Sequence, residues 1–492
     1  MRRQNLYLLR MATHNGNSNG NHQTTGSKDS LVFGQTSQGA EVQGTLVRLT
    51  RYVAVFEVYN PALVLRTSEV IENFKIIIQD RTIYSGRAVV RSLVNAGLTL
   101  VCEVKLNESS FSVLSISSPD ASMRESFGEF IGQWQTIYKV IPEFKVVLAD
   151  MQTFLSELRI WLDQMELQIR SSPSGDRGEM EHDAVREIGE AMVPAFNNLH
   201  ERLEELSGTI PEDLRPAHQN LSRRQLHPLT LCSPFAYRTY SKPLGYAGDY
   251  EMVNMIARDP FEGGSLFAKV VNFWFLSQWP ATAHRNRIQF LKQSLQEETL
   301  RGMRAGKPLR IFNLGCGPAR EIQQFLSENT ICNHTNLTLV DFNEETVQHI
   351  TRVLNQIKQQ SGAQTPIQVL KKSVHQIIKE GHRPSVGTDD AKYDFVYCAG
   401  LFDYLSDRTC RQLMNIFYQW LAPGGLLLAT NVNDTKPFRH MLEFVLDWHL
   451  IYRNQNSAQG LLPEGSRRED ARFQEDETSV NIFIEVRKPE NA

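Results

Sequence analysis

The feature that most constrains the fold is a run of short apolar segments alternating with helical segments in the C-terminal part of the chain. The first of them, Leu309–Leu314, ends in Gly315-Cys316-Gly317, and a helical pattern starts directly afterwards. Glycines at such a turn let the backbone approach a ligand closely, and the helix N-terminus supplies unpaired N–H groups. The alternation predicts a mostly parallel sheet covered by helices.

The next apolar segment, Leu337–Val340, ends in Asp341, 24 positions after Gly317. An acidic residue at the carboxyl end of the second strand can accept two hydrogen bonds from a ribose diol. A dinucleotide site would require a third glycine at position 320, where this chain has Arg320. The pattern therefore predicts a nucleoside ligand without a pyrophosphate seated on the helix.

Later apolar segments extend the same alternation: Ile367–Leu370, Tyr393–Tyr397, Leu426–Thr430 and a final strand at Asn481–Val486. The turn Pro423-Gly424-Gly425 precedes one of these strands and is the sharp reversal that a parallel sheet needs. Together the motifs over Pro308–Lys488 resemble a class I S-adenosylmethionine-dependent methyltransferase with a Rossmann-like α/β fold. The resemblance implies S-adenosyl-L-methionine as the cofactor of a domain at residues 305–492.

The same resemblance implies a set of cofactor-binding residues along the carboxyl edge of the sheet. They are Gly315, Cys316 and Gly317 at the methionine end, Asp341 on the ribose, Phe342 and Asn343 near the adenine, Ser373 and Val374 at its edge, and Gly400 and Leu401 below the sulfonium. Two positions depart from the family pattern. Asn313 replaces the usual acidic residue before the first glycine, and Ser373 stands where an Asp is common.

Short β-branched runs predict a small antiparallel barrel over residues 41–110. This segment resembles a PilZ domain. Arg87 and Arg91 have the RxxxR spacing of that family's ligand site but come late in the barrel, and Ser112 stands where the motif requires glycine. We therefore expect a structural or protein-binding barrel that does not bind cyclic-di-GMP.

The remaining segments have simpler patterns. Residues 1–40 contain little to bury after the first dozen positions and predict a disordered tail. Apolar residues at helical spacing predict a helical linker over 120–225 and a helical lid or substrate region over 226–300. The Trp and Met stripe of the linker indicates core packing, and a homodimer through the linker stays open.

Composition excludes several classes of protein. The chain has 492 residues and a net charge of -3, which is too small for nucleic acid to bind by bulk electrostatics. Its six cysteines contain no CxxC pair, so we expect no disulfide framework and no metal site. No apolar stretch reaches the ~20 residues of a membrane helix, and the start does not resemble a signal peptide. We expect a cytoplasmic protein without stable membrane insertion.

Methyl transfer from a sulfonium is an in-line displacement, so the protein mainly aligns the nucleophile with the methyl group. A carboxylate acceptor needs no general base, whereas a hydroxyl or an amine does. The segment Lys436–Arg453 combines an apolar face, suited to an acyl chain, with basic residues that can meet an acid headgroup. His440, His449 and Arg453 are the predicted catalytic residues.

Four blocks carry a closer resemblance: Gly245–Met252, His284–Arg287, Leu314–Glu321 and Asp447–Arg453. They resemble the bacterial family of extracellular-factor 3-hydroxypalmitic acid methyl ester biosynthesis proteins. That resemblance implies methylation of the carboxylate of a 3-hydroxy fatty acid, which makes a methyl ester for quorum sensing. It also implies that Tyr246, Asp249 and Arg285 close over the cofactor or substrate from the lid.

Two other functions fit the same residues. In a signalling adaptor, the barrel would sense a ligand or partner and the methyltransferase fold would be a scaffold. In the second alternative, the enzyme methylates a small-molecule hydroxyl or amine and uses a base such as His440 or His449. Titration with cyclic-di-GMP and the pH dependence of histidine variants separate these alternatives.

Overall fold

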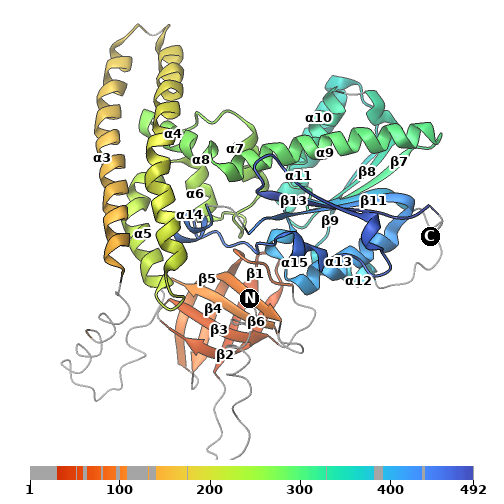
Figure 1. The fold of residues 1–492 in the computed structure, drawn as a ribbon, viewed down its shortest axis with the longest axis horizontal. Coiled ribbons are helices and arrows are strands. Elements are labelled where there is room, and N and C mark those ends of the chain that lie inside the picture. The colour runs from red at the N-terminus through yellow and green to blue at the C-terminus, as the bar shows by residue number, and fades with distance from the viewer. Residues whose placement is uncertain are drawn as a thin grey trace, which may run out of the picture.

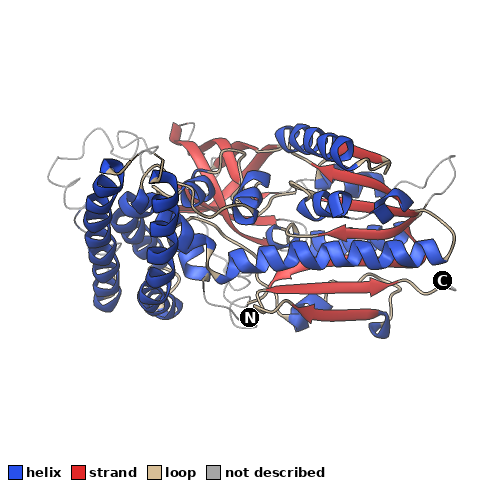
Figure 2. Ribbon diagram, turned by 90° about the horizontal axis from the view of Figure 1, so that it is seen from above, coloured by secondary structure: helices blue, strands red, loops and turns tan. Residues whose placement is uncertain are grey.

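The structure is a computed structural model that describes residues 30–50, 52–58, 64–78, 81–95, 100–107, 131, 140–173, 175–328, 330–381, 392–434 and 438–490. It contains a closed antiparallel barrel, a helical middle part and a C-terminal α/β domain (Figures 1 and 2). The predicted fold class is confirmed. The tail expected before residue 30, most of the linker before residue 140 and Ser112 lie outside the described residues.

Six strands form the barrel in the order β1-β2-β3-β6-β5-β4. They are β1 (Leu31–Thr36), β2 (Glu41–Leu49), β3 (Val53–Val58), β4 (Val70–Ile78), β5 (Arg81–Asn95) and β6 (Leu100–Leu106). Phe56, Phe74 and Tyr84 fill the interior. The barrel begins at Leu31, inside the segment that composition suggested was a tail. Backbone hydrogen bonds to both β2 and β4 hold β1 in the barrel, and Val32 of this strand is buried in the barrel core.

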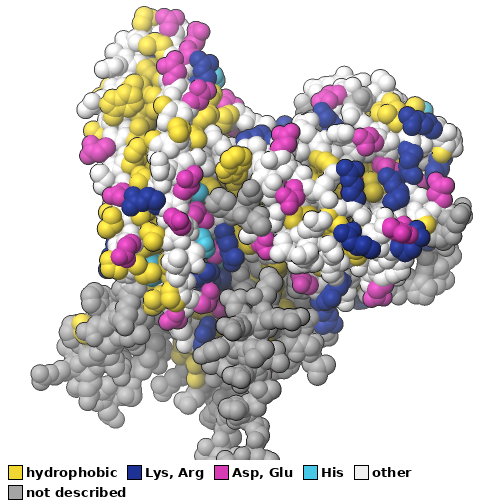
Figure 3. All heavy atoms as spheres, viewed as in Figure 1, with side chains coloured by type: hydrophobic (Ala, Val, Ile, Leu, Met, Phe, Trp, Pro, Cys, Tyr) yellow, Lys and Arg dark blue, Asp and Glu magenta, His cyan; other side chains and the backbone are white. Residues whose placement is uncertain are grey.

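The helical part consists of α3 (Pro142–Ser171), α4 (Arg177–Thr209), α5 (Arg215–Thr230), α6 (Pro234–Ser241), α7 (Tyr250–Ala257) and α8 (Leu266–Leu276). The helices α3 and α4 pack side by side as a long hairpin that projects from the body of the molecule (Figure 1). Apolar side chains remain exposed along this hairpin (Figure 3), among them Val146, Ile160, Trp161, Leu167 and Met180. A homodimer through the hairpin stays a prediction.

The C-terminal sheet has the strand order β12-β13-β11-β10-β7-β8-β9. Its strands are β7 (Leu309–Leu314), β8 (Thr335–Asp341), β9 (Ile367–Lys371), β10 (Tyr393–Cys398), β11 (Leu421–Val432), β12 (Ala471–Glu475) and β13 (Asn481–Arg487). The strands from β11 to β9 are parallel, whereas β13 and β12 pair antiparallel. The strand order reverses between β7 and β10, and ligands bind outside the carboxyl ends of strands at such a switch point.

Helices cover both faces of this sheet. They are α9 (Trp279–Arg304), α10 (Arg320–Glu328), α11 (Glu344–Ser361), α12 (Val374–Gly381), α13 (Asp407–Trp420) and α15 (Gln455–Gln459). The short helix α14 (Arg439–Phe444) packs against the helical part instead, and short 3₁₀ turns lie at Thr330–His334, Phe402–Tyr404 and Arg468–Asp470. One apolar core joins α9, α10 and α11 to the sheet, and a second joins α12 and α13 to it. None of the helices in the described ranges combines the length and apolarity that crossing a bilayer requires.

Two details of the sheet differ from the sequence pattern. The edge strand β12 was not predicted, because Ala471–Glu475 contains only two apolar residues. The Pro423–Gly425 turn lies inside β11, where the register with β10 shifts and Gly424 has a φ of 74°. The reversal expected before the strand is therefore an irregularity within it.

Candidate functional site

A cavity opens at the carboxyl ends of β7, β8 and β10, where the strand order reverses. Residues of the barrel and of α7 and α9 form its other walls. Nine predicted cofactor residues line this cavity: Tyr246, Gly315, Cys316, Gly317, Asp341, Phe342, Val374, Gly400 and Leu401. Their individual roles stay predictions, but the fold brings them together from five separate segments.

The loop after β7 has a conformation that requires its glycines. Gly315 has a φ of 72° and Gly317 a φ of 50°, a region that residues with a side chain rarely adopt. The N–H groups of Gly315 and Cys316 donate to the carbonyl of Val340, at 2.8 and 3.1 Å, and hold the loop against β8. A Cβ at Gly317 would meet nothing within 4 Å, so the loop borders open space.

Asp341 ends β8 and is 4% exposed. Its carboxylate accepts hydrogen bonds from the N–H groups of Gly317, at 3.1 Å, and Asn343, at 3.0 Å. Burial raises the pKa of Asp341 above its ordinary value, and these backbone donors oppose that rise. Each carboxylate oxygen has a second lone pair, so two further donors such as ribose hydroxyls can still bind.

A polar cluster lies behind the glycine loop. The Tyr397 hydroxyl donates to Glu321 at 2.8 Å, and the Asn313 amide lies 3.4 Å from the same carboxylate oxygen. The buried Oδ1 of Asn313 has no hydrogen-bond partner among the described residues. Glu321 thus supplies a carboxylate beside Asn313, the position where the family pattern has an acid. Burial raises the pKa of Glu321.

The barrel contributes a guanidinium to the cavity wall. Arg66 is 3% exposed, and its guanidinium carbon lies 4.0 Å from the ring centre of Phe342 and 5.2 Å from that of Tyr246. Glu69 pairs with Arg66 at 3.4 Å. Thr67 also lines the cavity, and its N–H donates to the carbonyl of Tyr404 at 3.1 Å. No motif connects these residues with a site more than 200 positions away, so the sequence did not reveal them.

Arg287 is a second buried guanidinium in the cavity. It is 8% exposed and makes no hydrogen bond or ion pair with any residue that the structure describes. A Cβ added at Gly400 would lie 2.9 Å from its Nη2, so the guanidinium borders the end of β10. Burial lowers the pKa of Arg287, with the negative charge of Asp403 opposing. A buried cation without a partner carries a large desolvation cost, which a bound anion would offset.

Besides Arg287 and His284, the lid contributes apolar side chains to the cavity. Met252 and Val253 of α7 and Ile288 and Leu291 of α9 line it. Trp448 also lines the cavity, and its indole N–H donates to the Tyr404 hydroxyl at 3.0 Å. The cavity therefore combines a polar floor with an apolar side.

Four predicted cofactor residues do not line the cavity, because their side chains have local partners. Asp249 caps α7 through the N–H of Met252 and pairs with Arg238. Arg285 donates to the carbonyls that end α7 and α8. Asn343 caps α11, and Ser373 accepts from the N–H of Gln376.

The three predicted catalytic residues also lie outside the cavity lining. The backbone N–H of His440 donates to Glu204 of α4, and His449 has its Nε2 3.3 Å from Asp447. Arg453 is 2% exposed and donates to Asp407 and to buried carbonyls around the Phe402–Tyr404 turn. The expected acyl-binding helix is also only six residues long, and the apolar face of α14 packs against the helical part.

His284 lines the cavity as a neutral imidazole. Its Nδ1 donates to the Pro280 carbonyl at 2.8 Å, and burial, reinforced by the charge of Arg287, lowers its pKa to about 3. An unfolded histidine titrates near ~6.5, so below that pH the unfolded chain binds a proton that the folded chain does not, and stability falls. Asparagine at this position keeps a donor for Pro280 but does not titrate.

We therefore expect the wild type to lose roughly 2 kcal/mol more unfolding free energy than His284→Asn between about pH 7 and pH 5. Urea unfolding of both proteins across this range measures the difference. If the unfolding free energies of the wild type and His284→Asn changed equally with pH, His284 would not be held neutral in the folded protein.

Residues 312–427 match the family model of a methyltransferase domain. No curated protein sequence matches the chain. The chain is similar to a possible exported protein from Bordetella parapertussis, with 18% identity, a TM-score of 0.39, and coverage of 65% of this chain and 99% of that one. It is also similar to the N-methyltransferase NodS from Bradyrhizobium japonicum in complex with S-adenosyl-L-homocysteine, with 16% identity, a TM-score of 0.29 and coverage of 51% and 99%.

The matched residues contain the glycine loop, Asp341 and the ends of β7, β8 and β10. The open space at Gly317, the remaining acceptor capacity of Asp341 and the unpartnered Asn313 oxygen fit a nucleoside with a polar tail. The described residues hold no cluster of three His, Cys, Asp or Glu side chains that could bind a metal ion. The C-terminal part of the chain thus carries a methyltransferase domain of the class I fold, and S-adenosyl-L-methionine is the cofactor that this domain and its cavity indicate.

Proposed function

We propose that this protein methylates a carboxylate, and that the acceptor is a 3-hydroxy fatty acid. The observation that carries the proposal is the buried guanidinium of Arg287 beside Gly400, which has no hydrogen-bond or ion-pair partner in the described part of the chain. A guanidinium binds a carboxylate through two parallel hydrogen bonds, which fix the orientation of its oxygens. Arg287 can therefore hold the acceptor next to the end of β10, where the family resemblance places the sulfonium of the cofactor.

S-adenosylmethionine supplies an electrophilic methyl group on a positively charged sulfur when it is bound. Asp341 accepts hydrogen bonds from the ribose, and the loop at Gly315 and Gly317 leaves room for the methionine end. Arg287 would orient one carboxylate oxygen of the acceptor toward the bound methyl donor. The donor would supply the methyl group for the new O–CH₃ bond, and its sulfur would keep the electron pair of the C–S bond. Alignment of this kind supplies ~7–11 kcal/mol of a reaction barrier.

The titratable groups of the cavity fit an acceptor that needs no general base, such as a carboxylate. A carboxylate arrives ionised at neutral pH, so no residue has to remove a proton. His284 is a weak base, because its pKa is about 3. Glu321 already accepts a hydrogen bond from Tyr397. A hydroxyl or amine acceptor would need a stronger base than His284 offers.

The apolar wall supports a fatty acyl chain. Met252, Val253, Ile288 and Leu291 present hydrocarbon side chains to the cavity. Each methylene group that such a wall buries contributes ~0.8 kcal/mol. The 3-hydroxyl group of the acceptor rests on the family resemblance alone.

Methyl-labelled S-adenosylmethionine, incubated with the purified protein and 3-hydroxy fatty acids of graded chain length, tests the proposal. We expect mass spectrometry to detect labelled methyl esters, and we expect none from the corresponding primary amides. Label on the hydroxyl group, or label on the amides, would refute methylation of a carboxylate.

A further inference from the structure

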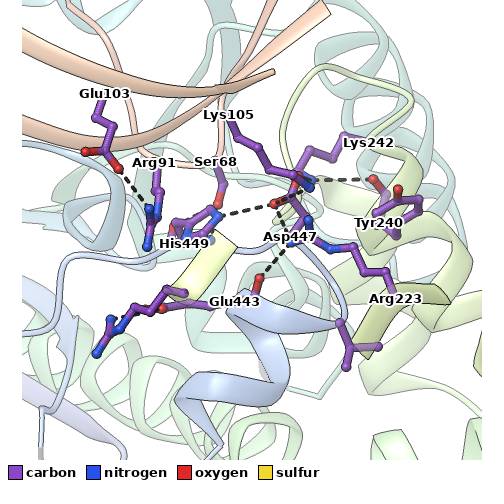
Figure 4. A network of polar contacts seen from close by, with 12 residues as sticks. Ser68, Arg91, Glu103, Lys105, Arg223, Tyr240, Lys242, Glu443, Asp447 and His449 are labelled. Atoms are coloured by element: carbon purple, nitrogen blue, oxygen red, sulfur yellow. Dashed lines mark hydrogen bonds and ion pairs between the residues drawn. The ribbon is translucent and has the colours of Figure 1, made fainter. Parts of the chain in front are cut away.

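A second cleft of about 560 Å³ lies between the barrel and the helical part of the molecule. Five basic side chains line it: Arg87, Lys105, Arg223, Arg224 and Lys242. Asp447 is the one carboxylate among its lining residues in the described ranges. Figure 4 shows Lys105, Arg223 and Lys242 arriving from different elements around this carboxylate. Among the described residues that line the cleft, cations outnumber carboxylates, although the whole chain carries a net charge of -3.

Three of the cations share Asp447. Arg223 lies 2.8 Å from its carboxylate, Lys105 3.4 Å and Lys242 3.8 Å. The cation Arg87 pairs with Glu72 at 3.0 Å, and Glu72 does not line the cleft. One carboxylate cannot neutralise three cations, so positive charge remains beside it.

Arg223 also has unused hydrogen-bond donors. Its side chain is 7% exposed, and its Nη2 donates to Asp447 and to the Glu443 carbonyl. Its Nε and Nη1 have no hydrogen-bond partner in the described structure. The Lys242 side chain is 2% exposed, and burial lowers its pKa to about 8. Buried donors without acceptors are costly, and an oxyanion in the cleft would satisfy them.

Aromatic side chains accompany this charge. Tyr237 is 58% exposed, and Tyr240 lies beside Lys242, whose Nζ is 5.9 Å from the Tyr240 ring centre. Both tyrosines line the cleft. A ring that lines the same cleft as these cations can stack on an aromatic ligand whose anionic group binds the cations.

We propose that this cleft binds a small molecule that carries both a phosphate group and an aromatic ring. Arg223, Lys105, Lys242 and Arg87 bind the phosphate oxygens, and Tyr237 contacts the ring. The site is separate from the methyltransferase cavity and adds a ligand that the proposed reaction does not use.

The cleft and the methyltransferase cavity share two short segments. Asp447 lines the cleft, whereas the next residue, Trp448, lines the cavity. In the barrel, Thr67 lines the cavity and Val70 the cleft, and Ser68 between them hydrogen-bonds to the His449 backbone. A phosphate that competes with Asp447 for Arg223 therefore acts on the residue adjacent to the cavity wall. Ligand in the cleft should alter the affinity for S-adenosylmethionine.

Calorimetric titration of the full chain in phosphate-free buffer tests the site, with AMP and pyrophosphate as probes. We expect saturable binding of both and tighter binding of AMP, because only AMP has a ring for Tyr237. Equal affinities would refute the aromatic contact, and no saturable binding of either probe would refute the site. Tyr237→Ala should remove the advantage of AMP.

Variants on the barrel side of the cleft, at residues less buried than Arg223, avoid the risk that Arg223 substitutions prevent folding. Arg87→Gln combined with Lys105→Gln should weaken pyrophosphate binding about tenfold or more. Arg48→Gln is the matched control, because Arg48 is an exposed barrel arginine that pairs with Glu103 and does not line the cleft. Equal weakening by Arg48→Gln would show that general charge, not the cleft, attracts the anion.

The coupling has a separate readout that does not depend on the acceptor. We expect saturating AMP to change the dissociation constant of S-adenosylmethionine by about fivefold or more. An unchanged constant would refute the coupling. Methyl transfer is not measured in these titrations, so their failure and a failure of the proposed reaction are distinguishable.

Discussion

Asp341→Ala is expected to abolish measurable binding of S-adenosylmethionine, which the wild type should bind at micromolar concentration. The substitution removes the acceptors for both ribose hydroxyls, and hydrogen bonds to a charged group contribute ~1.5–3 kcal/mol each. Their combined loss weakens binding by a factor on the order of 10² to 10⁴. It also removes the acceptor that holds the Gly317 N–H, so the glycine loop loses a contact. Calorimetric titration measures the effect.

Asp341→Asn is the matched variant, because it keeps the shape and one acceptor oxygen. We expect it to bind S-adenosylmethionine with intermediate affinity. Circular dichroism of both variants controls for folding. Undiminished binding by Asp341→Ala would remove the cofactor assignment.

Arg287→Met is expected to raise the KM for the fatty acid by roughly 10²-fold, with little change in the affinity for S-adenosylmethionine. Methionine keeps much of the side-chain volume but cannot bind a carboxylate. A bidentate pair between two charged groups is among the strongest polar contacts in proteins, and losing two charge-assisted hydrogen bonds gives an effect of this size. Because Arg287 has no partner in the described structure, the variant should fold normally.

Two comparisons make this prediction specific. Arg287→Lys keeps the charge without the planar fork, so its KM should lie between those of the wild type and Arg287→Met. Arg285→Met removes a neighbouring guanidinium that binds carbonyls outside the cavity, so it should lower stability without raising KM. Weaker cofactor binding with an unchanged KM in Arg287→Met would mean that Arg287 holds the carboxylate of the cofactor instead.

The glycine loop and Asp341 were predictable because they depend on local rules. Glycine is required where φ is positive, as at Gly315 and Gly317, and this requirement is visible in the order of residues. A strand end followed by a helix start places both groups at one edge of a parallel sheet, whatever the rest of the chain does. Nine predicted residues consequently line one cavity.

The acceptor side of the site depended on longer-range packing. Arg66 and Thr67 line the cavity because the barrel packs against the α/β domain, and no repeat or spacing encodes that contact. His449 and Arg453 looked catalytic because basic residues in a long segment suit an acid headgroup. In the folded chain His449 lies beside Asp447, and the buried Arg453 guanidinium pairs with Asp407 and donates to backbone carbonyls, so neither residue lines the cavity.

Local sequence therefore decided that one edge of a parallel sheet would present backbone N–H groups and a carboxylate, because turn geometry and strand order depend on neighbouring residues. Tertiary packing alone decided which buried guanidinium groups keep hydrogen-bond donors without acceptors among the described residues. Arg287 faces the cavity and Arg223 faces the second cleft only because α9, α5 and the barrel meet the rest of the chain at those places. The free-energy cost of burying a charged side chain depends on the groups that surround it in three dimensions. The order of residues in the sequence does not show that cost.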